Sequence, residues 1–422
     1  MMLNVSLNKR CLEKGNLLLS LLFKITICLS IVMILFTKSN TCYGTSYIFS
    51  SNDNNINESS ISTSVSSPVF IFESFAQILM EPYTGNIIYA NNENERIYPA
   101  SVTKIMTLLL IMENIDSGKI KYDDKVTCSA NASSLGGSQI WFEENEQISV
   151  EDGLRAICIA SANDVTVSMA EYIGGSEENF VKMMNEKAKL LGMNNTNFVN
   201  PHGLHDDNHY TTAMDIAIMS REIITKHKDI FKFTSIWMDS IRGGTFDLSN
   251  TNKLVKYYEG GIGLKTGYTS QSLYNLSGVA KRDDTMFLTV VCKAPSSEVR
   301  LNETKQLLDF GFSNYEVNKI MDYNCIIDNI SLNKSIDKKY NVIVKDEISM
   351  LKEKGVNTNY INVIEYNKNI NLPITSLDSI GRIKIVDDNN NIVEEKDIYL
   401  ECNVFKSNIK DYLKHILNKV IT

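Results

Sequence analysis

A serine and a lysine three residues apart stand at the start of a long apolar run. Ser101 and Lys104 precede the segment Ile105 to Met112, which is apolar nearly throughout and predicts a buried helix. Residues three apart on a helix share a face, so the Lys104 amine can reach the Ser101 hydroxyl. A serine becomes a nucleophile when a base takes its proton, and lysine is such a base when burial or nearby positive charge lowers its pKa. The pair therefore predicts a nucleophile beside a general base.

The spacing alone is weak, because Ser-x-x-Lys recurs in the chain, for example at Ser331 and Lys334. Two later motifs strengthen the first copy: Ser161-x-Asn163, and the single Lys-Thr-Gly sequence at 265–267. We expect the first motif to open a core helix, the second to lie in a loop between helices and the third to lie on a strand. Penicillin-binding proteins and class A β-lactamases carry a trio of this kind in the same order, with Ser-Asp-Asn as the middle motif.

The elements that must position these residues indicate an α+β domain, in which helices pack on an antiparallel sheet. A hairpin is predicted where two apolar runs flank Pro82 to Gly85. Capping signals such as Ser149 and Ser176 predict helix starts in the middle of the domain. The expected elements are strands at 76–80 and 86–90, helices at 154–159, 165–173 and 180–191, strands around 265 and at 274–280 and 285–291, and a closing helix at 296–310.

From about Phe75 to Phe312 the chain resembles the low-molecular-mass penicillin-binding proteins of the D-alanyl-D-alanine carboxypeptidase type. This resemblance implies a β-lactamase/transpeptidase-like domain (an antiparallel sheet with a helical block), a small β-rich domain and a C-terminal amphipathic helix. Beyond the three motifs it rests on the segments Met80 to Gly85, Pro99-Ala100-Ser101, Asn200-Pro201-His202-Gly203-Leu204 and Leu307 to Phe312.

The resemblance also implies catalytic roles. Ser101 would attack the carbonyl of the penultimate D-Ala of a peptidoglycan stem peptide, expel the terminal D-Ala and remain as an acyl-enzyme. Lys104 would accept the Ser101 proton, and Ser161 would relay a proton to the leaving amine. Asn163 would orient the substrate amide and Lys104. β-Lactam antibiotics would act as covalent inhibitors.

The third motif and one later arginine would bind the substrate. Lys265 would lower the pKa of Lys104 and attract the substrate carboxylate, to which Thr266 would offer its hydroxyl. Gly267 completes the motif, and the backbone N–H groups of Tyr268 and the nucleophile would form an oxyanion hole. Arg300 matches an arginine of the family that holds the terminal carboxylate, for which a guanidinium is suited by bidentate bonding.

Several partners are not expected. The formal net charge of −8 argues against nucleic acid, because phosphate binding needs a basic surface. No cofactor or metal is expected, although His202, His205 and His209 lie near two aspartates; a structural or rim role is preferred for them. Five cysteines follow the N-terminal region without a C-x-x-C pair, so buried free thiols are predicted rather than disulfides or zinc. They are Cys128, Cys158, Cys292, Cys325 and Cys402.

The two ends of the chain predict export and membrane contact. Basic residues precede apolar runs up to Phe36, which is typical of a signal peptide. Cleavage would follow Gly44, although Lys24 leaves a retained anchor open. From Val404 to Ile421 the apolar residues fall on one side of a helix and the lysines largely on the other, which predicts a helix at the extracytoplasmic membrane surface. The predicted order is signal peptide 1–44, Ser/Asn-rich linker 45–67, catalytic domain 68–318, β-rich domain 319–402 and amphipathic helix 403–422.

Two other functions remain as alternatives. A class A-like β-lactamase shares the first and third motifs but needs a glutamate-positioned water, and no Glu-x-x-Leu-Asn equivalent lies between Asn163 and Lys265. A catalytically silent peptidoglycan-binding scaffold is disfavoured because every motif residue is present.

Overall fold

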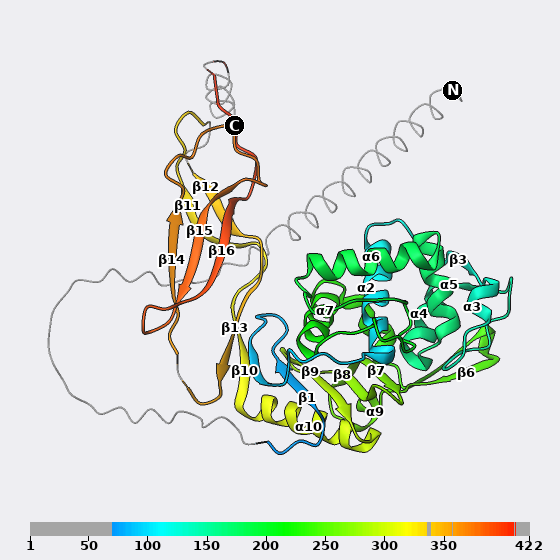
Figure 1. Ribbon diagram of the computed structural model, residues 1–422. Coiled ribbons are helices and arrows are strands. Elements are labelled where there is room, and N and C mark those ends of the chain that lie inside the picture. The colour runs from blue at the N-terminus through cyan, green and yellow to red at the C-terminus, as the bar shows by residue number, and fades with distance from the viewer. Residues whose placement is uncertain (1–69, 336–338, 357, 409, 411–422) are drawn as a thin grey trace, which may run out of the picture. The chain divides into compact units, whose positions relative to one another are not determined.

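The computed structural model describes residues 70–335, 339–356, 358–408 and 410. These divide into two compact units, one comprising 70–318 with 349–356 and the other comprising 319–348 with the described part of 358–410. Figure 1 shows helices and strands in the first unit and mainly strands in the second. The predicted signal peptide and linker lie outside the described residues.

A five-stranded antiparallel sheet forms the centre of the first unit, in the order β2-β1-β9-β8-β7. The predicted hairpin is confirmed, because β1 pairs with β2 across a turn closed by Glu81, whose carboxylate accepts the Thr84 N–H at 2.7 Å. Strand β7 is an edge strand and carries the Lys-Thr-Gly motif. The strands are β1 (Ala76–Met80), β2 (Ile87–Asn91), β7 (Gly261–Thr269), β8 (Leu273–Arg282) and β9 (Thr285–Ala294).

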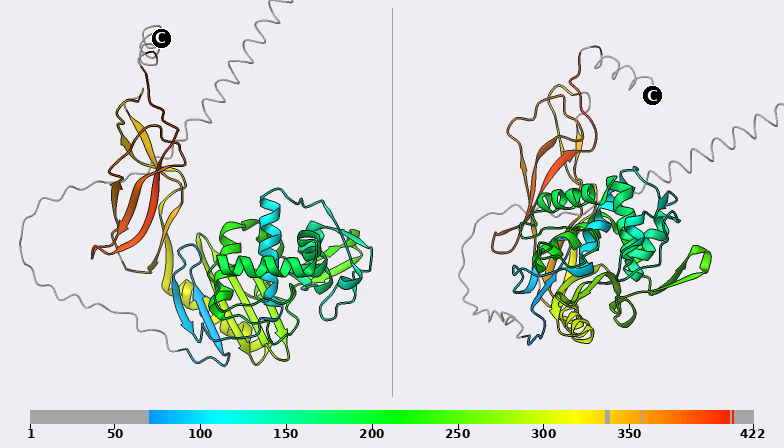
Figure 2. Two further views of the ribbon diagram at one scale, coloured as in Figure 1. Left: turned by 45° about the horizontal axis from the view of Figure 1, so that its top comes forward. Right: turned by 45° about the vertical axis from the view of Figure 1, so that its right-hand side comes forward.

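Side chains that alternate along the strands give the sheet two apolar faces. In β9, Leu288 and Val290 join one core cluster, whereas Phe287 and Val291 join another. Helix α10 (Ser297–Asn314) supplies Leu307 and its neighbours to the second cluster. The first cluster is shared with α2 (Lys104–Asp116) and α7 (Ala213–Lys226). Figures 1 and 2 show α10 and α2 on opposite sides of the strands.

The helical block beside α2 places the middle motif. Helix α4 (Val150–Arg155) continues into a π-helical turn, η2 (Ala156–Ala160), which ends at Ser161 in the left-handed region. Helix α5 (Asn163–Gly174) begins two residues later. The other elements of this unit are η1 (Ala100–Thr103), β3 (Lys125–Thr127), α3 (Ala130–Ser133), β4 (Gln147–Ser149), α6 (Glu177–Leu190), η3 (Lys228–Ile230), α8 (Phe231–Thr234), β5 (Met238–Ile241), η4 (Arg242–Gly244), β6 (Phe246–Ser249) and α9 (Leu254–Tyr257).

The second unit is an antiparallel sheet in the order β11-β12-β16-β15-β14. Its core is made of alternating aliphatic side chains, including Val342, Ile383 and Ile398, all 0% exposed. Strands β10 and β13 form a separate two-stranded ribbon, and β13, apart from Ile348, belongs to the first unit. The strands are β10 (Tyr315–Met321), β11 (Cys325–Ile330), β12 (Tyr340–Val344), β13 (Ile348–Glu353), β14 (Ile361–Tyr366), β15 (Ser379–Val386) and β16 (Ile392–Leu400).

Three expectations need correction. The helix predicted at 154–159 is α-helical from Val150 to Arg155 and π-helical from Ala156 to Ala160, while the predicted cap at Ser149, which accepts the Asp152 N–H, is confirmed. Of the five cysteines, Cys402 is exposed rather than buried, while the other four are buried as predicted. The predicted C-terminal helix does not begin at Val404, which pairs with Ile374 in a β-bridge and is followed by non-helical residues to 408.

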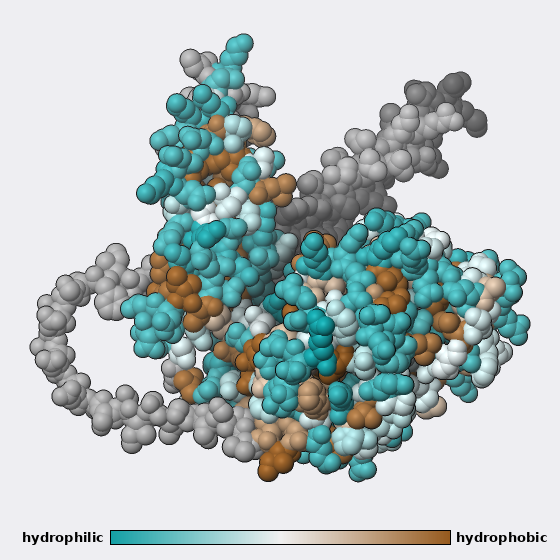
Figure 3. All heavy atoms as spheres, in the orientation of Figure 1, coloured by the Kyte–Doolittle hydropathy of each residue, from teal (hydrophilic) through white to brown (hydrophobic). Residues whose placement is uncertain are grey.

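The remainder of the predicted C-terminal helix, apart from Lys410, lies outside the described residues. In the part of the chain that the structure describes, no helix is long and apolar enough to cross a membrane. On the face drawn in Figure 3, hydrophilic side chains cover most of the surface and apolar ones form small separate groups.

Candidate active site

Ser101 and Lys104 lie where a tight turn becomes a helix. Ser101 belongs to the 3-10 turn η1 rather than to the α-helix expected from the sequence, and Lys104 is the first residue of α2. Ala100 enters the turn in the left-handed region, with φ 49°. The Lys104 Nζ lies 3.0 Å from the Ser101 Oγ. The predicted contact between nucleophile and base is therefore present.

The Lys104 amine has two further contacts that fix its orientation. Its Nζ lies 2.7 Å from the Asn163 Oδ1 and 2.7 Å from the backbone oxygen of His202. Both oxygens can only accept hydrogen bonds. A neutral amine has two N–H groups and one lone pair, so these acceptors occupy both N–H groups. The lone pair is then directed at the Ser101 hydroxyl, as a general base requires.

The Asn163 amide is itself held by the loop before β4. Its Nδ2 donates to the Gly136 oxygen at 2.7 Å, and its backbone N–H donates to the Ser138 oxygen at 2.7 Å. The first bond decides which way the amide faces, because Nδ2 must point to a carbonyl. Oδ1 is therefore left to accept from Lys104.

Ser161 lies beside this group in a special backbone conformation. Its φ of 62° is uncommon for a residue other than glycine, and it ends the π-helical turn η2. Its side chain is buried, and its Oγ has no hydrogen-bond partner in the described part of the chain. Because buried hydroxyls are normally paired, this one is available to a substrate.

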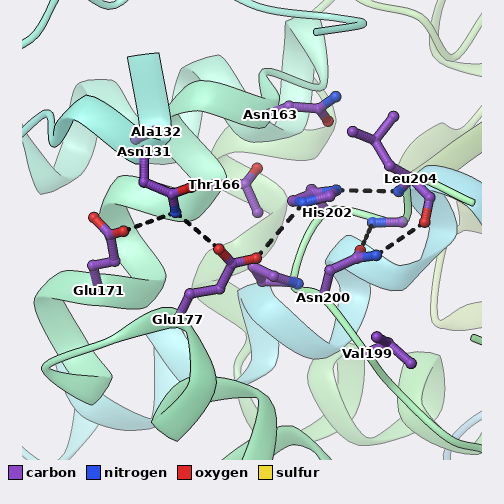
Figure 4. Close-up of polar contacts among 12 residues, drawn as sticks. Asn131, Ala132, Asn163, Thr166, Glu171, Glu177, Val199, Asn200, His202 and Leu204 are labelled. Atoms are coloured by element: carbon purple, nitrogen blue, oxygen red, sulfur yellow. Dashed lines mark hydrogen bonds and ion pairs between the residues drawn. The ribbon is translucent and has the colours of Figure 1, made fainter. Parts of the chain in front are cut away.

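The loop at 200–204 delivers the carbonyl that binds Lys104. Gly203 has φ +88°, and a Cβ placed there would lie 1.9 Å from the Ala100 oxygen, so only glycine fits. Asn200 closes the loop by accepting the Gly203 N–H at 2.7 Å and donating to the Leu204 oxygen at 2.9 Å. These bonds are visible in Figure 4.

The His202 ring is a structural part of this loop. Its Nδ1 accepts the Leu204 N–H at 3.1 Å, and its Nε2 lies 3.7 Å from a Glu177 carboxylate oxygen (Figure 4). Burial, followed by the charge of Lys104, lowers the pKa of His202 to about 3. His209 is likewise bonded, to the Thr103 hydroxyl at 2.8 Å. Within the described residues no group of three His, Cys, Asp or Glu side chains could hold a metal ion.

Burial determines the protonation of the two lysines. Lys104 is 0% exposed, and desolvation, followed by the nearby charge of Lys265, lowers its pKa well below the ordinary value. Desolvation, helped by the positive charge of Arg300, lowers the pKa of Lys265 to about 7. Burial and the neighbouring charge therefore both favour the uncharged form of Lys104, the form that can accept a proton.

Strand β7 lies directly against the nucleophile. A Cβ at Gly267 would lie 2.7 Å from the Pro99 oxygen and 3.1 Å from the Ser101 nitrogen, so glycine permits this close approach. The next residue, Tyr268, is exposed, and the centroid of its ring lies 4.3 Å from that of the Tyr274 ring. The edge of the sheet and the nucleophile turn therefore enclose one end of the site.

Two buried cationic side chains, Lys265 of β7 and Arg300 of α10, have no counter-charge among the described residues. Lys265 is 1% exposed, and its Nζ donates to the Thr266 oxygen at 3.1 Å. Arg300 is 7% exposed, donates from Nη1 to the Asn275 oxygen at 3.1 Å, and has an Nε without a partner among the described residues. Neither forms an ion pair within the described ranges. Because buried charges are normally paired, this region fits an anionic ligand.

Several contributors to the site were missed by the sequence reasoning. The Asn275 side chain donates to the Tyr98 and Pro99 oxygens at 2.9 and 3.2 Å and so ties β8 to the nucleophile turn. The Thr251 hydroxyl lies 2.8 Å from that of Thr266. The carbonyls of Gly136 and His202 carry no side-chain signal. The asparagine in Asn200-Pro201-His202-Gly203 was the one available clue, because such residues form turns.

Comparisons with known proteins decide the family. The family model described as D-alanyl-D-alanine carboxypeptidase matches residues 62–296, and one described as penicillin-binding protein 5, C-terminal domain, matches residues 315–406. The chain belongs to the D-alanyl-D-alanine carboxypeptidase family. It is a serine-type D-Ala-D-Ala carboxypeptidase and a low-molecular-mass penicillin-binding protein, with the fold class predicted from its sequence.

Individual relatives of this carboxypeptidase agree with the family models. It is 40% identical over 349 residues to D-alanyl-D-alanine carboxypeptidase DacF from Bacillus subtilis, covering 82% of this chain and 89% of that protein. The structure of penicillin binding protein 5 from Haemophilus influenzae matches 80% of this chain and 99% of its own, with a TM-score of 0.68 and 29% identity. Ampicillin-bound penicillin-binding protein D2 from Listeria monocytogenes matches 58% of this chain and 99% of its own, with a TM-score of 0.54 and 28% identity.

We predict that Gly203→Ala slows acylation of the carboxypeptidase by penicillin at least about tenfold, because the displaced loop withdraws an acceptor from Lys104. The matched control is Gly192→Ala, at φ +78° with no atom within 4 Å of the added Cβ. This control should lose about 1 kcal/mol of stability and keep its acylation rate. Fluorescent penicillin labelling and thermal unfolding of both variants provide the measurement. Equal acylation rates would contradict the role given to the loop.

We also predict that kcat/KM for D-Ala release falls above about pH 7, where Lys265 loses its proton and its attraction for the substrate carboxylate. Lys265→Arg should move this decline to higher pH, because a guanidinium stays charged. The exposed Lys281, exchanged for Arg, should leave the profile unchanged. A Lys265→Arg profile that coincides with the wild type would disprove the assignment.

Proposed function

We propose that Ser101 is the nucleophile and Lys104 the general base of the carboxypeptidase. The observation that carries the proposal is the buried Lys104 amine, whose two N–H groups are taken by fixed acceptors while its third contact is the Ser101 Oγ. Lys104 takes the hydroxyl proton as Oγ bonds to the carbonyl carbon of the penultimate D-Ala. The carbonyl π-electrons move to the oxygen, and the backbone N–H groups of Ser101 and Tyr268 donate hydrogen bonds to the resulting oxyanion.

Collapse of this intermediate breaks the bond from carbon to the terminal D-Ala nitrogen. The leaving amine needs a proton, which Lys104 holds and the Ser161 hydroxyl can relay. The lack of a partner for the Ser161 Oγ in the described part of the chain supports this role. An ester of Ser101 remains, and water then attacks it with Lys104 again as the base, which releases the shortened peptide and restores the enzyme.

The substrate carboxylate is proposed to bind at Lys265, Thr266 and Arg300. The two cations are buried without counter-ions in the described ranges, so a terminal carboxylate supplies the missing negative charge. Burial and the Coulomb attraction reinforce each other, because a charge pair is stronger where water is excluded. This arrangement explains a preference for cleavage next to a free chain end rather than within a chain.

β-Lactams are proposed to acylate the same serine. The Listeria relative has been solved in ampicillin-bound and cefotaxime-bound forms, which supports acylation here. In the part of the chain that the structure describes, no carboxylate contacts Lys104; its partners are Ser101, Asn163 and a carbonyl. A β-lactamase would need a carboxylate to activate the deacylating water, so slow release of the drug is expected.

The enzyme is proposed to act on the outer side of the cell membrane. Its substrate belongs to the cell wall, and the sequence of residues 1–44 is typical of an export signal. A linker at 45–67 would lead to the catalytic domain at 68–318 and the β-rich domain at 319–402. The amphipathic pattern near the C-terminus would then attach the protein to the membrane surface.

Ser101→Ala is expected to abolish D-Ala release from a pentapeptide ending in D-Ala-D-Ala and to remove penicillin labelling, because no oxygen remains to be acylated. Both are measured with purified protein, using Ser129→Ala, whose serine only caps a short helix, as the control. Equal D-Ala release by the Ser101 variant would remove this residue from the mechanism. Rapid penicillin turnover by the wild type would favour a β-lactamase, and the absence of both activities a silent scaffold.

Removing residues 409–422 is expected to free the exported protein from membranes with D-Ala release unchanged. This cut keeps Val404, which pairs with Ile374 in the second unit. Full-length protein with Leu413→Glu and Leu417→Glu tests whether the apolar face, rather than chain length, is responsible. Membrane fractionation measures the result, and unchanged attachment of both variants would point to a retained N-terminal anchor.

A further inference from the structure

A loop that we call the strap, residues 136–146, connects α3 to β4 and touches the catalytic Asn163. Its Gly136 oxygen accepts from the Asn163 Nδ2, and its Ser138 oxygen accepts from the Asn163 N–H. A Cβ at Gly137 would lie 2.8 Å from the same Nδ2. The position of the strap therefore sets the position of the amide that accepts from Lys104.

Two charged side chains hold the backbone of the strap. Asp164, which is 0% exposed and follows Asn163, accepts the Ile140 and Phe142 N–H groups at 3.0 Å each. Arg242 of the β5–β6 hairpin binds the carbonyls instead, donating to the Ile140 oxygen at 2.9 Å and the Trp141 oxygen at 3.1 Å. The acid thus holds the donors of the strap and the arginine holds its acceptors.

Arg242 is in turn fixed by a bidentate ion pair. Its Nε lies 2.7 Å from the Glu146 Oε1, and its Nη2 lies 2.8 Å from the Oε2. Glu146 ends the strap, and its Oε2 also accepts the Glu143 N–H at 3.0 Å. One planar guanidinium therefore bridges the middle and the end of the strap, a geometry that lysine cannot reproduce.

The backbone at this bridge is under strain. Trp141 has φ 57° and Arg242 has φ 54°, a region that costs about 1 kcal/mol or more for residues other than glycine. The Trp141 side chain is 69% exposed, so its burial does not offset that cost. Ile140 and Phe142 are buried on either side and keep the strap folded. The hydrogen bonds of Arg242 therefore select the local conformation rather than the fold.

We propose that Arg242 is a positioning residue for the acylation step, acting through the strap on the Asn163 amide. The inference rests on the proposed roles of Ser101, Lys104 and Asn163. Without the guanidinium, the carbonyls at 140 and 141 lose their partners and the strained turn relaxes. Gly136 then no longer fixes the Asn163 amide, and the Lys104 lone pair loses its direction toward Ser101.

The test is the kinetics of acylation by a fluorescent penicillin, separated into the rate constant of the chemical step and the non-covalent dissociation constant. Arg242→Ala should lower the rate constant about tenfold, with little change in the dissociation constant. Arg242→Lys, which can retain one of the four hydrogen bonds, should lose less. The melting temperature of each variant, measured in parallel, separates this effect from unfolding.

Arg155→Ala is the matched control. Arg155 is as exposed as Arg242, at 29% against 23% of the side chain, and also binds the hairpin, through Asp239 at 3.4 Å. Its other partners are Glu151 and Asp152 of its own helix, none of which belongs to the strap. It should keep the wild-type rate constant. An equal loss in Arg155→Ala would show that general loosening of the hairpin, and not the strap, is responsible.

A double-mutant cycle tests the route. Acylation in the Asn163→Ala background is measured by mass spectrometry over hours. In this background, Arg242→Ala should have no further effect on the rate constant of acylation. Additive losses would overturn the proposal, as would a wild-type rate constant in Arg242→Ala or a change confined to the dissociation constant. If Arg242→Ala does not fold, Arg242→Lys is judged by the same outcomes. A wild-type protein that penicillin does not label would instead refute the proposed function.

Discussion

The withdrawal of one amine from water is the constraint on which the rest of this structure depends. An exposed Lys104 would be protonated at neutral pH and could not accept a proton. Each unit by which burial lowers its pKa corresponds to about 1.4 kcal/mol of discrimination against the charged form. The helix α2 supplies this burial, because it is apolar on nearly every side and lies between the sheet and the helical block. A central helix is therefore a requirement of the chemistry as well as of the core.

A buried amine can act as a base only if its lone pair points at the group that gives up the proton. The positions of the second and third motifs around Lys104 are consistent with this requirement. The asparagine of the second motif and a carbonyl from 200–204 fix the amine. The third motif, on the edge strand β7, approaches closely because Gly267 has no side chain. The site thus leaves positive charge at Lys265 and Arg300 unbalanced until a ligand arrives. Under the proposed mechanism, this imbalance lowers the stability of the free protein and favours binding of the substrate carboxylate.

The sequence predicts the fold and the family well because both depend on patterns of side chains. The hairpin at Pro82 to Gly85, the apolar α2 and the presence of the later strands follow from periodicity and turn residues, whereas the pairing of β1 with β9 does not. The comparisons confirm the family. The contact of Lys104 with Ser101 and Asn163 also agrees with the expectation from the motifs. Their catalytic roles stay predictions, since the geometry brings the residues together without testing the reaction.

What the sequence could not predict has a common physical cause, since it concerns backbone atoms and distant pairings. Nothing in a residue's identity says that the carbonyl of His202 or Gly136 will be an acceptor. The 3-10 turn at Ser101 and the π-helical turn before Ser161 depend on packing between segments far apart in the chain. Val404 likewise forms a bridge to Ile374, because pairing with a distant strand outweighs its local helical pattern.

The acceptor at His202 has an evolutionary consequence, because a peptide carbonyl cannot be deleted by substitution. Exchanging the histidine side chain leaves the oxygen in the chain, so only a change of the path of the loop removes it. Under the proposed mechanism, side-chain substitutions that confer drug resistance therefore have few ways to remove this acceptor from Lys104. Tolerated variation should collect instead at the exposed rim, where an antibiotic and a peptide differ in shape.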